Sequence, residues 1–137
     1  MQKISMLGSG FIGRFYTDSL HGYRNKDRVV SIYSRREESA KKFAEDYDVP
    51  HWTTDMEESI AHKDVDVVCI SLPNNLHEEA VHLCCKHNKA VICTKPLGRT
   101  AEEAKRMVEA VEKAGIFAGY LEAVSYTHLR AHETVSH

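Results

Sequence analysis

The sequence predicts an α/β fold, namely a doubly wound parallel sheet of the Rossmann type. Short apolar runs alternate with amphipathic stretches along the chain, which is the pattern of β-α-β units. A glycine-rich turn at 8–13 follows the first apolar run. The run at 65–72 is apolar at nearly every position, as a parallel strand covered on both faces should be.

The periodicity divides the chain into alternating strands and helices. Strands are expected at the short apolar or β-branched runs 3–7, 29–33, 51–53, 65–72, 90–93 and 116–121. Helices are expected at the amphipathic stretches 11–20, 36–47, 56–62, 78–87 and 101–114. Such an order of elements favours one parallel sheet with helices on both faces.

Cap and breaker residues set the boundaries of these elements. The segment 48–50 contains a proline and ends the helix before it, and either Thr54 or Asp55 can cap the next helix. Thr100 and Glu103 form a capping box, and Gly115 ends the helix that this box opens.

Composition and charge restrict the class of protein. The chain has 137 residues, of which 42% are hydrophobic and 28% charged, as in one ordinary globular domain. A formal net charge of −2 argues against a general binder of nucleic acid or anionic membranes. No stretch approaches the ~20 apolar residues that cross a bilayer, and no signal peptide is evident. We therefore expect a cytoplasmic protein.

Neither the cysteines nor the histidines form a ligand pattern. The four cysteines include no C-x-x-C pair, so buried, reduced thiols are expected. His77 and His82 are five positions apart and do not share a helix face. No acidic or thiol side chain completes a set of ligands with them, and we predict no metal site.

The turn at 8–13 has the G-x-G-x-x-G pattern of dinucleotide-binding loops. Gly8 allows a tight turn, Gly10 lets a pyrophosphate approach the backbone, and Gly13 lets the helix pack on the strand. The helix N-terminus adds free N–H groups and partial positive charge. The predicted cofactor-binding residues here are Gly8, Ser9, Gly10, Phe11, Ile12 and Gly13.

The end of the second predicted strand indicates which dinucleotide is bound. In a Rossmann unit a carboxylate about 20 residues past the glycines favours NAD. Here that position holds Ser34, followed by Arg35 and Arg36. A small hydroxyl with two guanidinium groups suits a 2′-phosphate, which predicts NADP as the cofactor, with NAD as the alternative. The other interpretation is that both arginines merely begin a solvated helix.

Two further motifs follow the fourth and fifth predicted strands, where open α/β sheets place their ligands. They are S-L-P-N-N-L-H at 71–77 and T-K-P at 94–96. With the glycine turn they resemble the glucose–fructose oxidoreductase, inositol dehydrogenase and rhizopine-catabolism family (Gfo/Idh/MocA), over residues 1–123. The family pattern T/S-x-P-N-x-x-H is intact, whereas Thr94 replaces the glutamate of E-K-P.

The resemblance implies hydride transfer between a nicotinamide cofactor and a sugar, polyol or related hydroxy or keto compound. It implies that Lys95 is catalytic, either as the proton donor or acceptor or as a cation that polarises the substrate oxygen. It also implies that the residues of the cofactor cleft include Leu72, Pro73, Asn74, Asn75, His77, Thr94, Lys95 and Pro96. For His77, capping or packing is the alternative role. The resemblance also implies a homo-oligomeric parent. The replacement at Thr94 supports a second hypothesis, a non-enzymatic NADP-binding sensor of the same fold.

The last part of the sequence differs from the rest. Residues 124–134 (V-S-Y-T-H-L-R-A-H-E-T) match an in-frame translation of the transposase adapter used in sequencing libraries. We therefore expect 1–123 to be the dinucleotide-binding domain of a longer parent, without the family's second α/β domain and inactive alone. Residues 124–137 are expected to be an artefactual, disordered tail.

Overall fold

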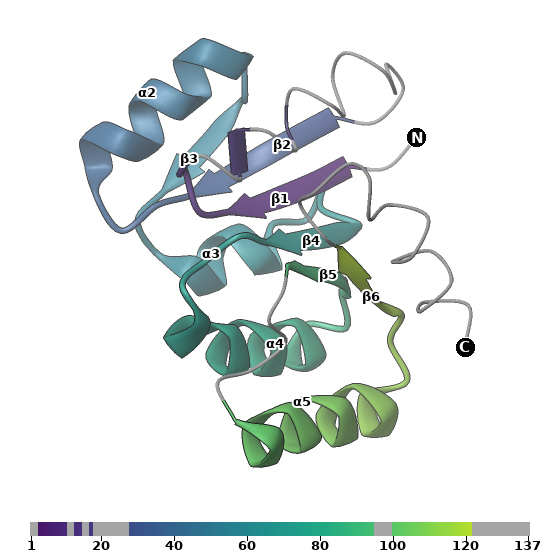
Figure 1. Cartoon of the computed structure of the whole chain (residues 1–137). Helices are drawn as coiled ribbons and strands as arrows, with labels where there is room; N and C mark the ends of the chain where they lie inside the picture. Colours follow the sequence, from purple (N-terminus) through teal and green to yellow (C-terminus); the bar gives the residue numbers. More distant parts are fainter. Residues whose placement is uncertain (1–2, 11–12, 15–16, 18–27, 95–99, 122–137) are drawn as a thin grey trace.

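The computed structural model describes residues 3–10, 13–14, 17, 28–94 and 100–121, and these contain one six-stranded parallel sheet (Figure 1). The strands are β1 (Lys3–Leu7), β2 (Arg28–Tyr33), β3 (His51–Thr53), β4 (Val67–Ile70), β5 (Ala90–Thr94) and β6 (Ala118–Leu121). The helices are α2 (Glu37–Tyr47), α3 (Met56–Ala61), α4 (His77–Lys86) and α5 (Ala101–Ala114), with a 3₁₀ turn η1 (Asn74–Leu76). The tail predicted at 124–137 lies outside the described residues.

The strand order is β3-β2-β1-β4-β5-β6, with every neighbouring pair parallel. The chain runs outward from β1 to β3 on one side and then returns to β4 on the other side of β1. This reversal between β1 and β4 is the switch point of a doubly wound sheet. The predicted fold class is confirmed.

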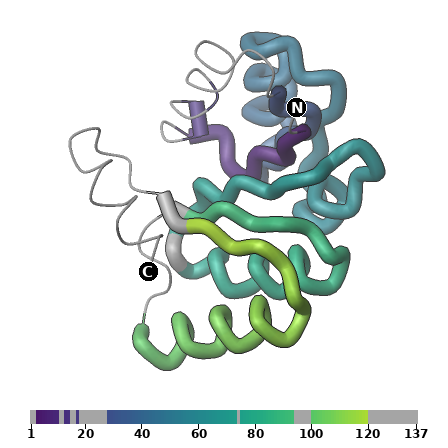
Figure 2. Tube along the Cα trace, turned by 90° about the vertical axis from the view of Figure 1, so that its right-hand side faces the viewer, coloured from purple at the N-terminus to yellow at the C-terminus, as the bar shows by residue number. Residues whose placement is uncertain are grey.

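Helices cover both faces of the sheet, as a parallel sheet requires. On one face, α2 packs through Phe43 and Ala44 against side chains of β1 and β2. On the other, α3, α4 and α5 bury a larger cluster that includes Ile60, Cys84 and Met107. Figure 2 shows α4 and α5 stacked on the side of the sheet opposite α2. Among the described residues, no helix is long and apolar enough to cross a bilayer.

Most predicted boundaries agree with the structure. Asp55 is the residue that caps α3, with its side chain accepting a hydrogen bond from the Glu58 backbone N–H. Thr100 caps α5 in the same way, and Gly115 ends that helix at a φ of +70°. Strand β4 is shorter than the apolar run 65–72, although hydrogen bonds from the backbone to β1 continue at Asp66 and Ser71.

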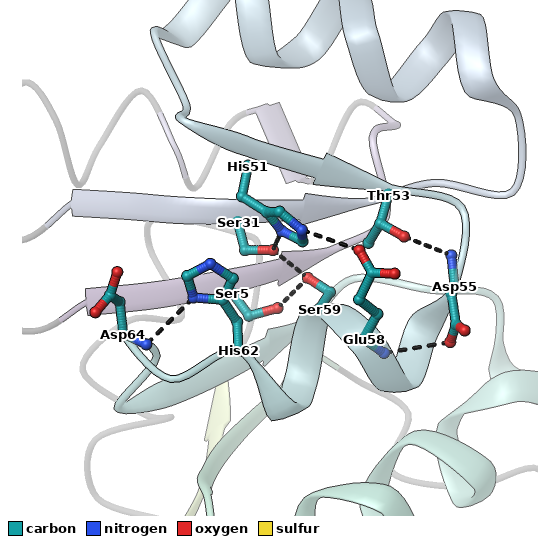
Figure 3. Close-up of polar contacts among 9 residues, drawn as sticks. All are labelled: Ser5, Ser31, His51, Thr53, Asp55, Glu58, Ser59, His62 and Asp64. Atoms are coloured by element: carbon teal, nitrogen blue, oxygen red, sulfur yellow. Dashed lines mark hydrogen bonds and ion pairs between the residues drawn. The ribbon is translucent and has the colours of Figure 1, made fainter.

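A chain of buried hydroxyl groups joins α3 to the sheet (Figure 3). The Ser59 Oγ atom lies 2.7 Å from Ser5 Oγ of β1 and 2.6 Å from Ser31 Oγ of β2, and none of these three serines has exposed surface. Ser31 Oγ also lies 2.8 Å from His51 Nδ1, and His51 Nε2 lies 3.0 Å from a carboxylate oxygen of Glu58. Helix α3 is therefore attached to the strands β1, β2 and β3 by polar contacts as well as by its apolar side chains.

Replacing Ser59 with alanine is expected to destabilise the fold. The S59A variant removes both hydrogen bonds from buried hydroxyls, which lowers the free energy of unfolding by about 1–3 kcal/mol. Urea denaturation measures the change. The matched control is S39A on α2, where a half-buried serine becomes a better helix former and stability does not fall. An unchanged midpoint for S59A would show that these contacts do not stabilise the fold.

Candidate functional site

The glycine-rich turn follows β1 and lies between the carboxyl ends of β2 and β4. The arrowheads of these strands point to the same side in Figure 1. Contacts tie it to both neighbours. The Gly8 backbone N–H donates to the Tyr33 carbonyl at the end of β2, at 2.9 Å. On the other side, the Ser71 hydroxyl donates to the Leu7 carbonyl at 2.9 Å and lies 3.4 Å from the Gly8 carbonyl oxygen.

The three glycines have different reasons to lack a side chain. Gly8 has a φ of +109°, and a Cβ there would lie 2.7 Å from the Ser71 carbonyl oxygen. A Cβ on Gly13 would meet the Gly8 carbonyl oxygen and lie 2.9 Å from Ser71 Oγ. By contrast, a Cβ on Gly10 would have no atom of the described residues within 4 Å. Gly8 and Gly13 are thus required by the fold, whereas the described residues leave space beside Gly10, where a dinucleotide-binding turn would admit a pyrophosphate.

A helical turn begins directly after this open space. The Arg14 N–H donates to the Gly10 carbonyl at 3.0 Å, and Gly13, Arg14 and Thr17 are helical. The start of a helix directs N–H groups and partial positive charge toward an anion. Phe11, Ile12 and most of the helix predicted at 11–20 lie outside the described residues.

The Arg14 side chain contacts α2. Its guanidinium Nη1 lies 2.9 Å from an Asp46 carboxylate oxygen, and its Cζ lies 5.4 Å from the centre of the Phe43 ring. The hydrogen bond from Arg14 lowers the pKa of the Asp46 carboxyl. Arg14 therefore connects the segment after the glycine turn to α2.

At the end of β2, hydroxyl and guanidinium groups lie beside the glycine turn. The Ser34 Oγ atom is 3.0 Å from Ser9 Oγ, and Ser34 is 8% exposed. The Ser34 N–H donates to the Thr53 carbonyl, which fixes the backbone at this point. Arg35 and Arg36 are exposed, and no hydrogen bond or ion pair joins either guanidinium to another described residue. This corner offers hydroxyls and positive charge, and the residue that follows β2 is serine and not a carboxylate.

On the other side of the switch point, the segment after β4 folds into a compact loop. Leu72 and Pro73 lead into η1, and the Leu76 N–H donates to the Pro73 carbonyl at 2.9 Å. Asn74 and Asn75 belong to η1. His77 begins α4 with no exposed surface, so its imidazole lies under the loop. Thr94 ends β5, and Lys95 and Pro96, which follow it, lie outside the described residues.

Two residues of this region had no individual role in the sequence prediction. Ser71 contacts the backbone of Gly8, and the Cys93 Sγ atom lies 3.4 Å from His77 Nδ1. The contact of Ser71 with Gly8 follows from the pairing register of β1 and β4. Leu7 pairs with Ile70, so the next residue of each strand, Gly8 and Ser71, must also lie side by side.

The cysteines are free thiols, and all but Cys85 are buried. Burial raises the pKa of Cys69, Cys84 and Cys93 to about 12 in each case. These thiols stay protonated at physiological pH and are poor nucleophiles. In the part of the chain that the structure describes, no group of three His, Cys, Asp or Glu side chains could hold a metal ion.

The sheet order and the glycine turn at its switch point define a dinucleotide-binding Rossmann domain. A family model described as an oxidoreductase family with an NAD-binding Rossmann fold matches residues 2–120. The chain therefore belongs to the Gfo/Idh/MocA oxidoreductase family, as its three motifs predicted.

Known proteins that resemble the chain agree with this family. It is 33% identical over 120 residues to trans-1,2-dihydrobenzene-1,2-diol dehydrogenase of Bos taurus, covering 87% of this chain and 35% of that protein. It is 30% identical over 129 residues to the scyllo-inositol 2-dehydrogenase (NADP(+)) of Bacillus subtilis (strain 168), covering 94% and 38%. The chain thus spans a little over a third of the length of these relatives.

Solved structures show the same fold. A probable dehydrogenase from Thermotoga maritima superposes with a TM-score of 0.81 at 28% identity, covering 86% of this chain and 35% of that one. A putative myo-inositol dehydrogenase from Sinorhizobium meliloti 1021 has a TM-score of 0.81 at 22% identity, covering 88% and 36%.

Alanine at Gly10 and at Gly13 is expected to have opposite effects. G10A places a methyl group in open space, so stability is unchanged, but affinity for NADPH falls about tenfold or more because the pyrophosphate loses its close approach. G13A drives a methyl group into the backbone of Gly8, which lowers the free energy of unfolding by about 1–3 kcal/mol.

Thermal denaturation and a fluorescence titration with NADPH measure the two effects separately. The expected outcome is a normal Tm with weak binding for G10A and a lowered Tm for G13A. If G10A bound NADPH as tightly as the wild type, the space above Gly10 would not be where the pyrophosphate binds.

Proposed function

We propose that this chain is the NADP(H)-binding domain of an oxidoreductase that moves a hydride between nicotinamide and a secondary alcohol or ketone of a sugar, polyol or related compound. The observation that carries the proposal is the corner at the end of β2. There the Ser9 and Ser34 hydroxyls lie 3.0 Å apart beside two exposed arginines.

The chemistry of this corner suits a phosphate on the 2′-oxygen of the adenosine ribose. A carboxylate at this position would accept hydrogen bonds from the two ribose hydroxyls of NAD and would repel a phosphate dianion. Hydroxyls can donate to phosphate oxygens, and guanidinium groups pair with them through two parallel hydrogen bonds. The resemblance to the B. subtilis enzyme, whose name specifies NADP(+), supports the same cofactor.

The roles of the chain's own residues follow from this placement. Gly10 and the helix start after it would hold the pyrophosphate, Ser34 and the arginines the 2′-phosphate, and the loop 72–76 would border the nicotinamide. When bound, the nicotinamide supplies or accepts the hydride. Lys95 directly follows β5, and its amine would give a proton to the substrate oxygen during reduction or take it during oxidation.

The wider setting is proposed on the same basis. The substrate would be a small hydroxy or keto compound, and the whole protein would be a homo-oligomer. Free thiols that are mostly buried support a reducing compartment, the cytoplasm.

Removing both arginines is expected to weaken the binding of NADPH selectively. The R35A/R36A variant loses charge-assisted hydrogen bonds to the 2′-phosphate, worth about 1.5–3 kcal/mol, so NADPH affinity falls about tenfold to a hundredfold while NADH affinity is unchanged. Isothermal titration calorimetry with both dinucleotides measures the difference.

The matched control is K63A, which removes an exposed positive charge just before β4. This residue lies near the amino ends of the parallel strands, opposite the carboxyl ends where the proposed site lies. It should leave both affinities as they are. Equal affinities of the wild type for NADPH and NADH would overturn the assignment of the corner to a 2′-phosphate.

A threonine where the family has glutamate favours a second candidate, a protein that binds NADP(H) without catalysing hydride transfer. Because the domain is expected to be inactive alone, the test incubates the longer parent protein with NADP⁺ and a panel of sugars and polyols and measures the absorbance of the reduced cofactor. Formation of NADPH with any member of the panel would contradict the sensor.

A further inference from the structure

His77 makes a defined pair of contacts although its side chain has no exposed surface. Its Nε2 atom lies 2.7 Å from the Leu72 carbonyl oxygen, and its Nδ1 atom lies 3.4 Å from Cys93 Sγ. A carbonyl oxygen can only accept, so Nε2 carries a hydrogen and donates it. The imidazole thereby holds Leu72, the first residue of the loop 72–76, by a hydrogen bond on the buried side of the loop.

The contact with Cys93 selects the form of the ring. The thiol of Cys93 is protonated because burial raises its pKa to about 12. If Nδ1 also carried a hydrogen, the imidazole would be a positive charge without exposed surface, which is costly to bury. The S–H group therefore donates to Nδ1, and the neutral tautomer with its hydrogen on Nε2 is the one that fits both partners.

These contacts fix the loop at its beginning, together with Ser71. The Ser71 hydroxyl binds the Leu7 carbonyl, and one residue later the Leu72 carbonyl accepts from His77. Cys93 lies on β5, two residues before Lys95. The pair of buried side chains thus connects the loop after β4 to the strand that leads into the proposed proton donor.

The place of the loop determines which half of the cofactor it meets. The 2′-phosphate corner at Ser34 lies on the β2 side of the glycine turn, so the adenosine half is bound there. The pyrophosphate crosses the switch point, and the nicotinamide half must continue on the β4 side, beside the loop 72–76.

We propose that His77 and Cys93 are positioning residues for the nicotinamide half of the cofactor. They hold the loop 72–76 in place through contacts on its buried side and do not touch the cofactor themselves. The inference rests on the proposed function, because it requires a dinucleotide bound across the switch point. It gives His77 a positioning role in place of direct contact with the cofactor.

The test compares NADPH with adenosine 2′,5′-bisphosphate, which contains only the adenosine half. In H77F, which fills the same space without either hydrogen bond, NADPH affinity should fall about tenfold while affinity for the bisphosphate stays within about twofold. C93A should show the same selective loss. C93S should restore NADPH binding, because a serine hydroxyl still donates to Nδ1.

The matched control is C84A, which truncates another buried thiol of the same apolar cluster. It lowers Tm as C93A does but leaves the ratio of the two affinities unchanged. A purely structural role of His77 and Cys93 would lower both affinities in parallel or neither, and that result would overturn the inference.

The two proposals can fail separately. If the wild type bound neither NADPH nor the bisphosphate, the proposed function would be wrong. If it bound both and the variants showed no selective loss, only the positioning role would be wrong.

¹⁵N NMR of the wild-type His77 imidazole gives a further measurement that needs no variant. The Nδ1 atom should carry no hydrogen, and a hydrogen on Nδ1 would contradict the arrangement.

Discussion

The close approach of three backbone segments at Gly8 is the constraint on which the site depends. Its N–H binds the end of β2, and its α-carbon lies so near to Ser71 after β4 that a methyl group would fall 2.7 Å from a carbonyl oxygen. Because the φ of +109° also excludes ordinary side chains, only glycine satisfies both conditions. The turn is thereby fixed at the switch point, and the described residues leave space open beside Gly10.

The two sides of this turn differ in chemistry because different strands end there. Toward β2, the chain presents hydroxyls and exposed guanidinium groups, which suit a negatively charged group of a ligand. Toward β4, the polar contacts are buried beneath the loop, between His77, Leu72 and Cys93. One side can therefore select the ligand by charge, whereas the other holds a loop in place.

Much of the fold was predictable because its signals are local. The apolar run at 3–7, the caps at Asp55 and Thr100 and the glycine pattern each depend on neighbouring residues, and the structure has all of them. Packing was only the alternative role predicted for His77, and neither its contact with Cys93 nor the hydroxyl chain through Ser59 was predicted. Both join segments far apart in the sequence, and periodicity carries no information on which side chains meet across a sheet.

The central claim is that a nicotinamide dinucleotide lies across the switch point, with adenosine toward β2 and nicotinamide toward β4. Backbone amide chemical shifts recorded during a titration with NADPH test it most directly. The largest changes are expected at Gly8, Gly10, Ser34 and the loop 72–76, with none at Lys63 near the amino ends of the strands. Changes centred on those amino ends, or confined to the β2 side, would contradict the claim.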